Sequence, residues 1–493
     1  MRSVSWPVET PVLAPGTLQK STSRISLIML ALHVPLAAAM YLSRSVATAH
    51  ALGVVLLGLL LLARRRYDML FYLVAYIAGS EVLWRICSAQ TNHEFAKYAC
   101  TFFLLCIGLR NLDLRKNSWV VFYFILLLPS IFITLDELPL NLARKRLSFN
   151  LSGPLSLTIA VLVLSNLKIS AIQLRQAFLS FIYPIFSIST CIAISLLRAD
   201  DLNFNTQSNF ETSAGFGPNQ VSSILAMGGI VTYLFYMLFL NKRLFRSTFI
   251  HRQVAIWLAG LYLVQSAFTF SRGGVYMAVA SILVAGTLLL RDREVRKKFL
   301  VNMTVLSTVG FFFVLPTLNR VTDGAFLARY LETDTTGRSE ILSMELELWR
   351  KNFFLGIGPG MRVYHIDEDV ASAAHTEYTR MIGEHGLLGL LALILLLWGL
   401  ANRIRILKDP QTRAIAASLI TCALLFWAVN GMRIYAPQLL ASLAFATILW
   451  RPEAKPIDPW AILPTQNPSF PDENPDTDQP HGPPMPQAQE VPS

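Results

Sequence analysis

Apolar runs of about 20 residues recur along most of the chain, and polar residues fall mainly in the gaps between them. The runs are continuous and do not alternate with a period of two, so they predict membrane-spanning helices and exclude a transmembrane β-barrel. We therefore expect an all-α, polytopic membrane helix bundle with about 14 transmembrane helices. The segments lie near residues 25–42, 46–63, 67–87, 96–110, 118–135, 151–167, 176–196, 220–240, 250–270, 273–290, 299–317, 381–400, 413–430 and 433–450.

Composition supports this interpretation. Hydrophobic residues make up 54% of the chain and charged residues 15%, against about 25% charged residues in soluble domains. The net charge of +11 comes largely from short loops between the apolar runs, where Lys and Arg set orientation, so we expect no nucleic-acid partner. The five cysteines show no metal-ligand or disulfide spacing and are expected to pack between helices.

The distribution of Lys and Arg predicts the topology. The basic loops alternate in a way that places both termini inside and the long loop outside. The first apolar run is too long for a typical signal-peptide core, so we expect it to be a permanent span. The expected organisation is a cytoplasmic N-terminal segment 1–24, membrane helices 1–11 over 25–317, a long external loop with short helices over 318–380, membrane helices 12–14 over 381–450, and a tail over 451–493.

The tail, 451–493, holds about half of the chain's 25 prolines and few large apolar residues. It cannot bury a core, so we expect it to be a disordered cytoplasmic segment. Polyproline II contacts could recruit a cytoplasmic partner there, and a solvated tail without a specific role is the simpler alternative.

The first candidate for chemistry is the very short outside connection Thr269–Phe270–Ser271–Arg272–Gly273–Gly274. It holds Arg272 at the membrane surface, and the planar guanidinium suits a pair of phosphate oxygens. Gly273 and Gly274 would allow a tight turn and close approach of the backbone to a ligand. The alternative is an arginine that reaches lipid headgroups.

The second candidate is an amphipathic helix predicted over 338–351 in the long loop. Arg338 would lie in its first turn, where a cation is unfavourable beside the positive helix end. A bound anion would resolve this conflict, and so would an ion pair with a nearby acidic residue. The apolar stripe of this helix is expected at Leu342, Leu346 and Trp349.

The third candidate is a glycine-rich loop with a histidine that follows it. The loop reads Gly356–Ile357–Gly358–Pro359–Gly360 and is not a Walker A loop, because no Gly-Lys-Ser/Thr follows.

His375 comes just before a membrane helix, where it could act as a general base on a lipid-borne substrate. Glu377 or Glu384 could orient it. His365 and His385 are rivals that spacing alone does not exclude.

Glu81 and Arg85 lie in the third apolar segment at i, i+4 spacing. Charged residues at membrane depth are functional candidates. We expect an intrahelical ion pair that faces the bundle.

Together these motifs resemble the bacterial O-antigen ligase and O-antigen polymerase superfamily. The resemblance rests on their order and on the large external loop before the last helices. The residues that carry it are Phe216–Gly217–Pro218–Asn219–Gln220, Thr269–Gly274, Thr336–Gly337–Arg338–Ser339, Gly356–Gly360, His375 and Glu384–His385–Gly386–Leu387–Leu388–Gly389.

The resemblance implies a GT-C-like membrane glycosyltransferase of the inner membrane with its active site facing the periplasm. The donor would be a glycan on undecaprenyl diphosphate, and the acceptor a saccharide or lipid A-core hydroxyl. By similarity, Arg272 and Arg338 would hold the diphosphate and His375 would activate the acceptor. The reaction would invert the anomeric centre without a metal, a nucleotide sugar or another cofactor. The glycines and the two glutamates named above would support the site.

Polymerase and ligase share this chemistry and differ in acceptor. A transporter or flippase of lipid-linked saccharides is the alternative from another class. Its many helices and basic external cleft would fit, but it would not need His375. A scaffold for polysaccharide-assembly proteins is a further option, suggested by the tail.

Overall fold

The structure is a computed structural model that describes residues 15–109, 112–199, 204, 207–240, 249–290, 293–332, 338–365 and 376–450. The predicted tail, 451–493, lies outside the described residues, and so does most of the predicted N-terminal segment. All described residues belong to one compact unit, Met1–Arg451. In chain order the elements are α1 Pro15–Leu42, α2 Arg44–Ala63, α3 Tyr67–Ile86, α4 Phe95–Gly108, α5 Trp119–Leu127, α6 Ile131–Glu137, α7 Leu140–Ser165, β1 Lys168–Ser170, α8 Ala171–Arg198, η1 Glu211–Ser213, α9 Pro218–Phe235, η2 Tyr236–Leu240, α10 Phe249–Phe268, α11 Arg272–Leu289, α12 Arg293–Val309, η3 Gly310–Val314, α13 Leu315–Val321, α14 Ala325–Leu331, α15 Arg338–Lys351, η4 Arg362–Tyr364, α16 Glu377–Ile406, α17 Pro410–Asn430, α18 Ala436–Leu443 and β2 Thr447–Leu449.

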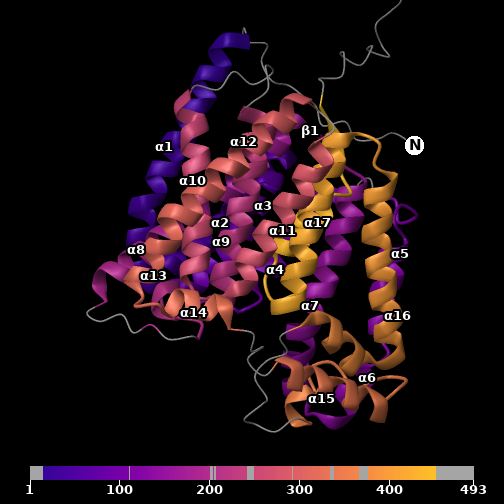
Figure 1. Ribbon diagram of the computed structural model, residues 1–493. Coiled ribbons are helices and arrows are strands. Elements are labelled where there is room, and N and C mark those ends of the chain that lie inside the picture. The colour runs from indigo at the N-terminus through magenta and orange to yellow at the C-terminus, as the bar shows by residue number, and fades with distance from the viewer. Residues whose placement is uncertain are drawn as a thin grey trace, which may run out of the picture. The chain divides into compact units, whose positions relative to one another are not determined.

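Within the described ranges, 11 helical stretches are long and apolar enough to cross a membrane. Two further predicted segments form the shorter α4 and the 20-residue α10. The prediction of a polytopic helical membrane protein is therefore confirmed. Most helices run roughly along one direction, so the bundle has two ends (Figure 1). We call the end with β1 the strand end, and the end with α6, α14 and α15 the loop end.

The predicted helix over 433–450 is wrong over much of its length. Only Ala436–Leu443 is helical, and the chain then turns over Ala444–Ala446 into β2, which pairs in parallel with β1. The guanidinium of Arg403, at the end of α16, donates to the carbonyls of Ala444, Phe445 and Ala446 at 2.8–3.2 Å. Because these donors satisfy the carbonyls beyond α18, the chain can leave the helix without losing their hydrogen bonds.

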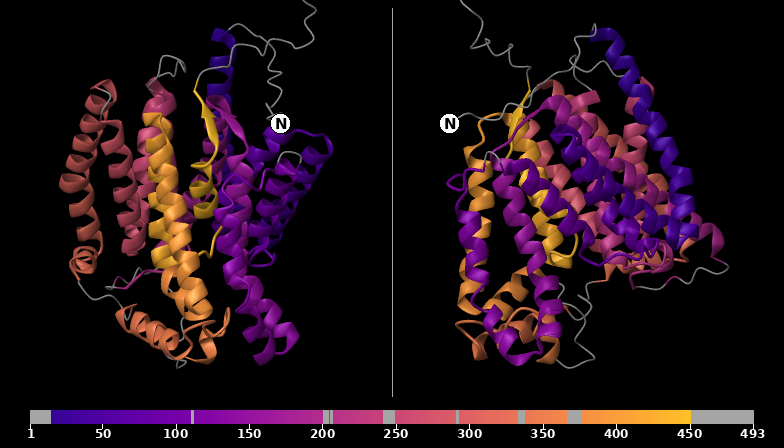
Figure 2. Two further views of the ribbon diagram at one scale, coloured as in Figure 1. Left: turned by 90° about the vertical axis from the view of Figure 1, so that its right-hand side faces the viewer. Right: turned by 180° about the vertical axis from the view of Figure 1, so that it is seen from behind.

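Two other boundaries differ from the apolar pattern. The predicted span 118–135 is divided near Pro129 into α5 and α6. The predicted span 151–167 belongs to α7, which already begins at Leu140. The added residues are mostly polar, so the apolar pattern missed them. Figure 2 shows α7 and α16 continuing past neighbouring helices at the loop end.

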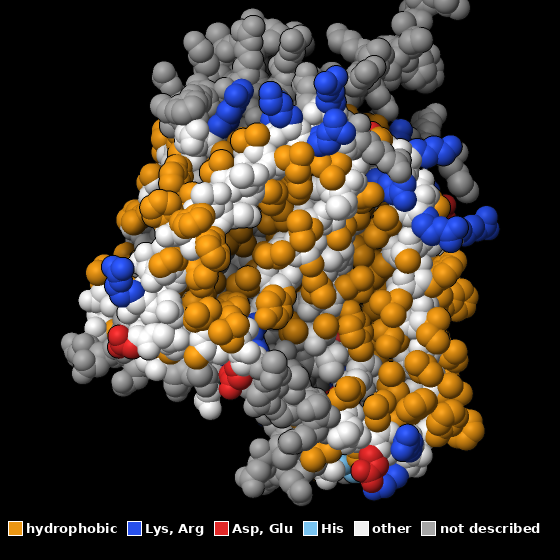
Figure 3. Space-filling view, in the orientation of Figure 1, with side chains coloured by type: hydrophobic (Ala, Val, Ile, Leu, Met, Phe, Trp, Pro, Cys, Tyr) orange, Lys and Arg blue, Asp and Glu red, His pale blue; other side chains and the backbone are white. Residues whose placement is uncertain are grey.

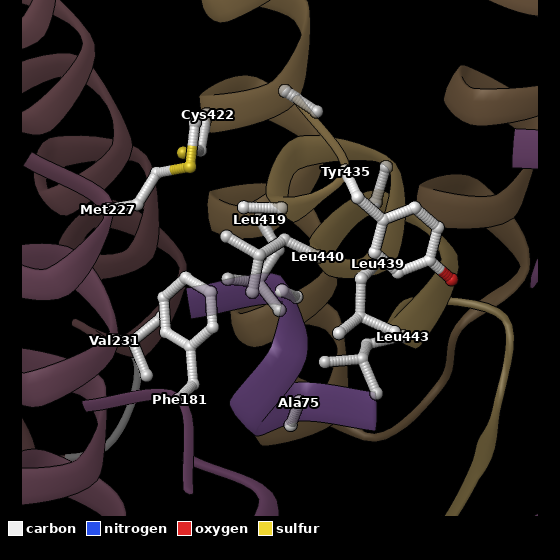
Figure 4. Packing of buried hydrophobic residues seen from close by; sticks show 14 of the residues in the cluster. Ala75, Phe181, Met227, Val231, Leu419, Cys422, Tyr435, Leu439, Leu440 and Leu443 are labelled. Carbon is white, nitrogen blue, oxygen red and sulfur yellow. The ribbon is translucent and has the colours of Figure 1, made fainter. Parts of the chain in front are cut away.

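The centre of the bundle is α9, whose most apolar window is entirely buried. Helix α8 lies between α3 and α9 and contacts small residues on both. A Cβ at Gly79 of α3 would lie 2.6 Å from the Phe181 carbonyl oxygen, and a Cβ at Gly228 of α9 would lie 2.7 Å from the Ile185 side chain. Small residues allow this close approach in membrane bundles. Figure 4 shows the result, with Phe181 beside Val231 and Met227 of α9 beside Cys422 of α17.

The outer helices expose broad apolar surfaces. Only 17%, 22% and 6% of the most apolar windows of α1, α2 and the α12–α13 stretch are buried. Figure 3 shows apolar side chains covering the middle of one face and Lys and Arg gathered mainly along the strand end. This pattern is typical of a surface that meets lipid tails between two polar boundaries.

The predicted external loop, 318–380, contains short helices in its described part. Helices α14 and α15 and the turn η4 lie there, at the loop end. The predicted helix 338–351 coincides with α15, so this prediction is confirmed.

Candidate active site

The predicted Arg272 connection lies between α10 and α11 at the loop end. The chain reverses at Phe270, which has φ +60°, and Ser271 then precedes the first residue of α11, Arg272. The Ser271 hydroxyl donates to the Asn219 side-chain oxygen at 2.8 Å. This contact joins two of the motifs that carry the resemblance.

Arg272 reaches across to α14. Its Nη1 donates to the backbone carbonyl of Arg329 at 3.5 Å and to that of Glu332. In return, Nε of Arg329 donates to the Phe270 carbonyl at 3.2 Å. Helix α14 is thus attached to the α10–α11 turn through two arginines.

Gly273 and Gly274 lie inside the first turn of α11, and the chain reversal that precedes them is made by Phe270. A Cβ at Gly274 would lie 2.7 Å from the carbonyl oxygen of Ser222 on α9. A Cβ at Gly273 would lie 3.2 Å from Val429 on α17. The two glycines therefore bring α11 close to α9 and α17, so the expectation that they form the turn itself is wrong.

The glycine-rich loop fits into a kink in α16. Gly356, Gly358 and Gly360 have φ of +71°, +91° and +80°, a region that favours glycine. The amides of Ile357 and Gly358 donate to the carbonyls of Gly383 and Glu384 at 3.1 and 3.0 Å.

The kink centres on Gly386, with φ +62° and ψ −141°. Its neighbour Leu387 donates its amide to the Phe353 carbonyl at 2.7 Å. The kink frees backbone groups of α16, and the glycine-rich loop satisfies some of them. The two glycine motifs, far apart in the sequence, therefore form one structural unit.

Glu377 and Glu384 meet at a buried arginine that the sequence analysis did not identify. Arg380 pairs with Glu377, and its Nη1 lies 2.8 Å from Oε2 of Glu384. Nη1 also donates to the Asn150 side-chain oxygen at 2.9 Å. The amide of Met432 donates to Glu377 at 3.0 Å. All three charged side chains are at least nine-tenths buried, so this is an internal charge network.

A cavity of about 90 Å³ opens beside this network. Its walls come from the extension of α7, the glycine-rich loop, the start of α16 and the connection between α17 and α18. The lining holds four arginines against two glutamates: Arg146, Arg362, Arg380 and Arg433, with Glu377 and Glu384. Such an excess of guanidinium groups favours an anionic or strongly polar ligand.

Helix α15 packs against this cluster with a face other than the predicted one. Leu342 and Leu346 are exposed, whereas Ile341 and Glu345 are buried. The predicted stripe is therefore wrong at Leu342 and Leu346, whereas Trp349 is half-buried. An ion pair accompanies the face that is buried. Oε1 of Glu345 lies 2.9 Å from Nε of Arg362. Burial raises the pKa of the Glu345 carboxyl, although the hydrogen bond from Thr379 and the Arg362 charge act in the opposite direction.

Arg338 is the first residue of α15, and its side chain lies outside the described part of the chain. His375 also lies outside the described residues. The next residue, Thr376, caps α16, and its hydroxyl oxygen accepts from the Tyr378 amide at 3.2 Å. His375 thus directly precedes the N-terminus of a membrane helix, as the sequence indicated.

The two rival histidines have different environments. His385 is buried, and its Nδ1 forms a hydrogen bond with the hydroxyl of Ser130 on the connection between α5 and α6. Its position inside the kink fits a packing role. His365 is exposed, directly after η4.

The Glu81–Arg85 pair is present and buried, with Nη2 2.5 Å from Oε1, which confirms the predicted ion pair. Arg85 has a wider role than the sequence indicated. It also donates to the Gln220 side-chain oxygen at 2.9 Å and to the Arg433 carbonyl at 3.2 Å. Gln220 follows Asn219, whose side-chain oxygen accepts from Ser271, and Arg433 lines the cavity. Arg85 therefore connects the Arg272 turn to the arginine-lined cavity.

A second link joins the same regions. The side-chain amide of Asn430 donates to the hydroxyl of Ser223 on α9 at 3.0 Å. Val429 packs on Gly273, and Met432, three residues later, lines the cavity. The Arg272 turn and the cavity are therefore neighbours at the loop end.

Comparison with known families agrees with these motifs. Residues 254–394 match the family described as O-antigen ligase. No curated protein matches the chain. The matched region contains Arg272, Arg338 and His375, and it confirms the resemblance drawn from the sequence. The chain is similar there to O-antigen ligases, which supports a multi-pass membrane enzyme of the O-antigen ligase or polymerase type.

Proposed function

We propose that this protein transfers a glycan from undecaprenyl diphosphate to a sugar hydroxyl during the synthesis of a cell-surface polysaccharide. The observation that carries the proposal is the O-antigen ligase match over 254–394, because it includes all three residues assigned to the reaction. The arrangement of Arg272 and the arginine-lined cavity at one end of the bundle supports it. The acceptor would be a growing saccharide in a polymerase or a lipid A-core sugar in a ligase.

In this proposal Arg272 and Arg338 bind the diphosphate. Each is the first residue of a helix, α11 and α15, where helix amides and a guanidinium attract the same anion. Negative charge grows on the leaving diphosphate as the glycosidic bond breaks, so cations that are already in place stabilise the transition state.

His375 acts as general base in the same proposal. It removes the proton from the acceptor hydroxyl while that oxygen attacks the anomeric carbon. The oxygen of the diphosphate leaves with the bonding electrons from the opposite face, so the anomeric centre inverts. The reaction as proposed uses neither a metal nor a nucleotide sugar.

Arg380 serves as a positioning residue. Its guanidinium joins Glu377 and Glu384 in the first turns of α16, before the kink at Gly386. This helix begins just after His375. The pair of carboxylates therefore fixes the start of α16, and Gly358 and Gly360 fix the loop that packs beside it. That Glu377 or Glu384 orients His375 stays a prediction.

The proposed location is the inner membrane, with both termini in the cytoplasm and the site facing the periplasm. Exposed basic residues near the strand end support this orientation, because cytoplasmic loops carry an excess of Lys and Arg. Representative positions are Arg64, Arg65, Arg66, Arg115, Lys116 and Arg405. We also propose that the tail, 451–493, lies in the cytoplasm.

The test uses a deletion strain complemented with wild type, Arg272→Ala or His375→Ala. Glycans and undecaprenyl-diphosphate intermediates are extracted and sized by mass spectrometry, with protein level checked by immunoblot. Single repeat units that accumulate on the lipid would identify a polymerase, and long chains retained on the lipid would identify a ligase. His365→Ala and Arg350→Ala are matched controls, because both side chains are exposed.

Normal glycans in the His375→Ala strain would refute the catalytic assignment. If intermediates then fail to reach the periplasm in the deletion strain, the transporter alternative would be favoured. Removal of 451–493 in the same strain tests recruitment: lost glycans with a normal level of membrane protein would indicate an assembly partner for the tail.

A further inference from the structure

A larger cavity, of about 220 Å³, lies beside Arg85. It occupies the loop end between the end of α3, the start of α4 and the segment before α9. Its volume is several times the roughly 30 Å³ that one water molecule occupies in the liquid. It therefore has room for a ligand larger than solvent, and none of the functions assigned above uses it.

One wall of this cavity is aromatic. Trp84, Phe95 and Phe216 contribute to it. The indole Nε1 of Trp84 donates to Nδ1 of His50 at 2.9 Å, and the Trp84 and Phe95 rings pack edge to face with centroids 5.8 Å apart. Because its polar edge is already bonded within the protein, Trp84 is held in place and offers the cavity an apolar surface.

The rest of the lining is polar. Ser88, Thr91, Asn92 and His93 line the cavity and offer hydroxyl, amide and imidazole groups. Three of these residues, Ser88, Asn92 and His93, are exposed, so the polar groups lie where a ligand can enter from the surface.

Arg85 supplies a buried donor. Its side chain is 9% exposed, and its Nη atoms are bonded to Glu81, Gln220 and two backbone carbonyls. Its Nε has no hydrogen-bond partner among the described residues. A buried donor without a partner is unfavourable, so a ligand acceptor that reached Nε would be stabilised.

The charges in this cavity balance. Glu81 lies beside Arg85 in the lining and neutralises it. The Glu81 carboxylate would repel a small anion. A lipid tail would leave the polar groups of the lining without hydrogen-bond partners. The lining therefore suits an uncharged ligand with both apolar and hydroxyl-bearing surfaces.

We propose that this cavity binds one pyranose ring of a substrate glycan. A pyranose has C–H faces that can lie on aromatic rings and hydroxyl groups around its edge that match the polar lining. The inference rests on the proposed function, which requires two glycans to meet beside Arg272. The cavity is suitably placed, because Arg85 contacts Gln220 and the adjacent Asn219 holds the Ser271 turn.

The test measures binding to the full-length protein in lipid nanodiscs. The first probe is the repeat unit released by mild acid from the host's own lipid-linked intermediates, and the second is the intact lipid-linked intermediate. Phe216→Ala should raise the Kd for the released repeat unit about tenfold, the equivalent of losing one aromatic contact. Phe216→Leu should also weaken binding, because it keeps apolar bulk but removes the flat ring. Phe210→Ala is the matched control, since Phe210 is 61% exposed and does not line the cavity.

The two probes identify which glycan occupies the cavity. If Phe216→Ala weakens binding of the released unit alone, the ring belongs to the acceptor, and if it weakens both, the ring belongs to the donor. Unchanged affinity for both probes in folded Phe216→Ala and Phe216→Leu proteins would overturn the inference. Arg272→Ala, tested with the lipid-linked probe, reports on the proposed function separately: if it loses binding while the Phe216 variants do not, only the sugar cavity is refuted.

Discussion

Gly386→Ala tests whether the kink in α16 depends on glycine. The backbone there has φ +62° and ψ −141°, a conformation that costs a residue with a side chain about 1–3 kcal/mol. A Cβ would also lie 2.5 Å from the Gly356 nitrogen and 2.6 Å from the Phe354 carbonyl carbon. Because these are backbone atoms, the glycine-rich loop must move away.

The loop is held by hydrogen bonds that the backbone amides of Ile357, Gly358 and Leu387 donate. Loss of two of them at about 1 kcal/mol each, added to the backbone strain, gives a destabilisation of about 3–5 kcal/mol. The damage should begin locally, so amide exchange in the peptide that contains Ile357 and Gly358 should become faster before the whole bundle unfolds.

The assay combines hydrogen exchange by mass spectrometry with thermal unfolding of the purified protein. Gly260→Ala is the matched control: Gly260 lies within α10, and a Cβ there would meet no atom within 4 Å. That change should be neutral or stabilise the helix by up to about 1 kcal/mol. If Gly386→Ala unfolds and exchanges like Gly260→Ala, the interlocked loop and kink do not exist as described.

Three further changes probe the charge networks and helix contacts. Arg380→Met leaves Glu377 and Glu384 buried without their counterion, so it should destabilise the protein by about 3–5 kcal/mol in chemical unfolding; a change below about 1 kcal/mol would contradict the network. Gly274→Ala should push α11 away from α9 and cost about 1–3 kcal/mol with reduced glycan output, whereas wild-type unfolding and output would mean that the contact is loose. Burial alone would raise the pKa of Glu94, but hydrogen bonds from its neighbours outweigh burial and lower its pKa to about 2. The stabilisation from the ionised carboxylate is complete above the ordinary pKa of 4.5 and is lost as pH falls toward 2. The thermal stability of wild type should therefore approach that of Glu94→Gln on acidification, and a constant difference between the two proteins down to about pH 3 would refute this.

The sequence could predict the helices and several motifs because both are local. Apolar runs mark membrane spans wherever lipid surrounds them, and α15 was predicted with its observed bounds. The spacing of Glu377, Arg380 and Glu384 along one helix would also have allowed their ion pairs to be predicted. The expectation that one of these glutamates orients His375 does not use this spacing.

Other parts of the candidate site depend on contacts between distant segments. Asn150 precedes the apolar run of α7 and is helical because the extension of α7 packs at the loop end. Arg433 lies in a segment that apolar content alone assigned to a helix. The exposed Leu342 shows the same limit, because a buried ion pair of Glu345 overrode the apolar pattern of α15.

The pairing of β1 with β2 has a consequence for the order of events during biosynthesis. β1, Lys168–Ser170, is made before α8, and its partner β2, Thr447–Leu449, is made after the last described helix. The backbone groups of β1, at the corner between α7 and α8, therefore stay without their β2 partners until almost the whole chain has been made. A chain whose translation stops early leaves β1 unpaired, and pairing of the two strands marks a chain that has been translated past the last described helix.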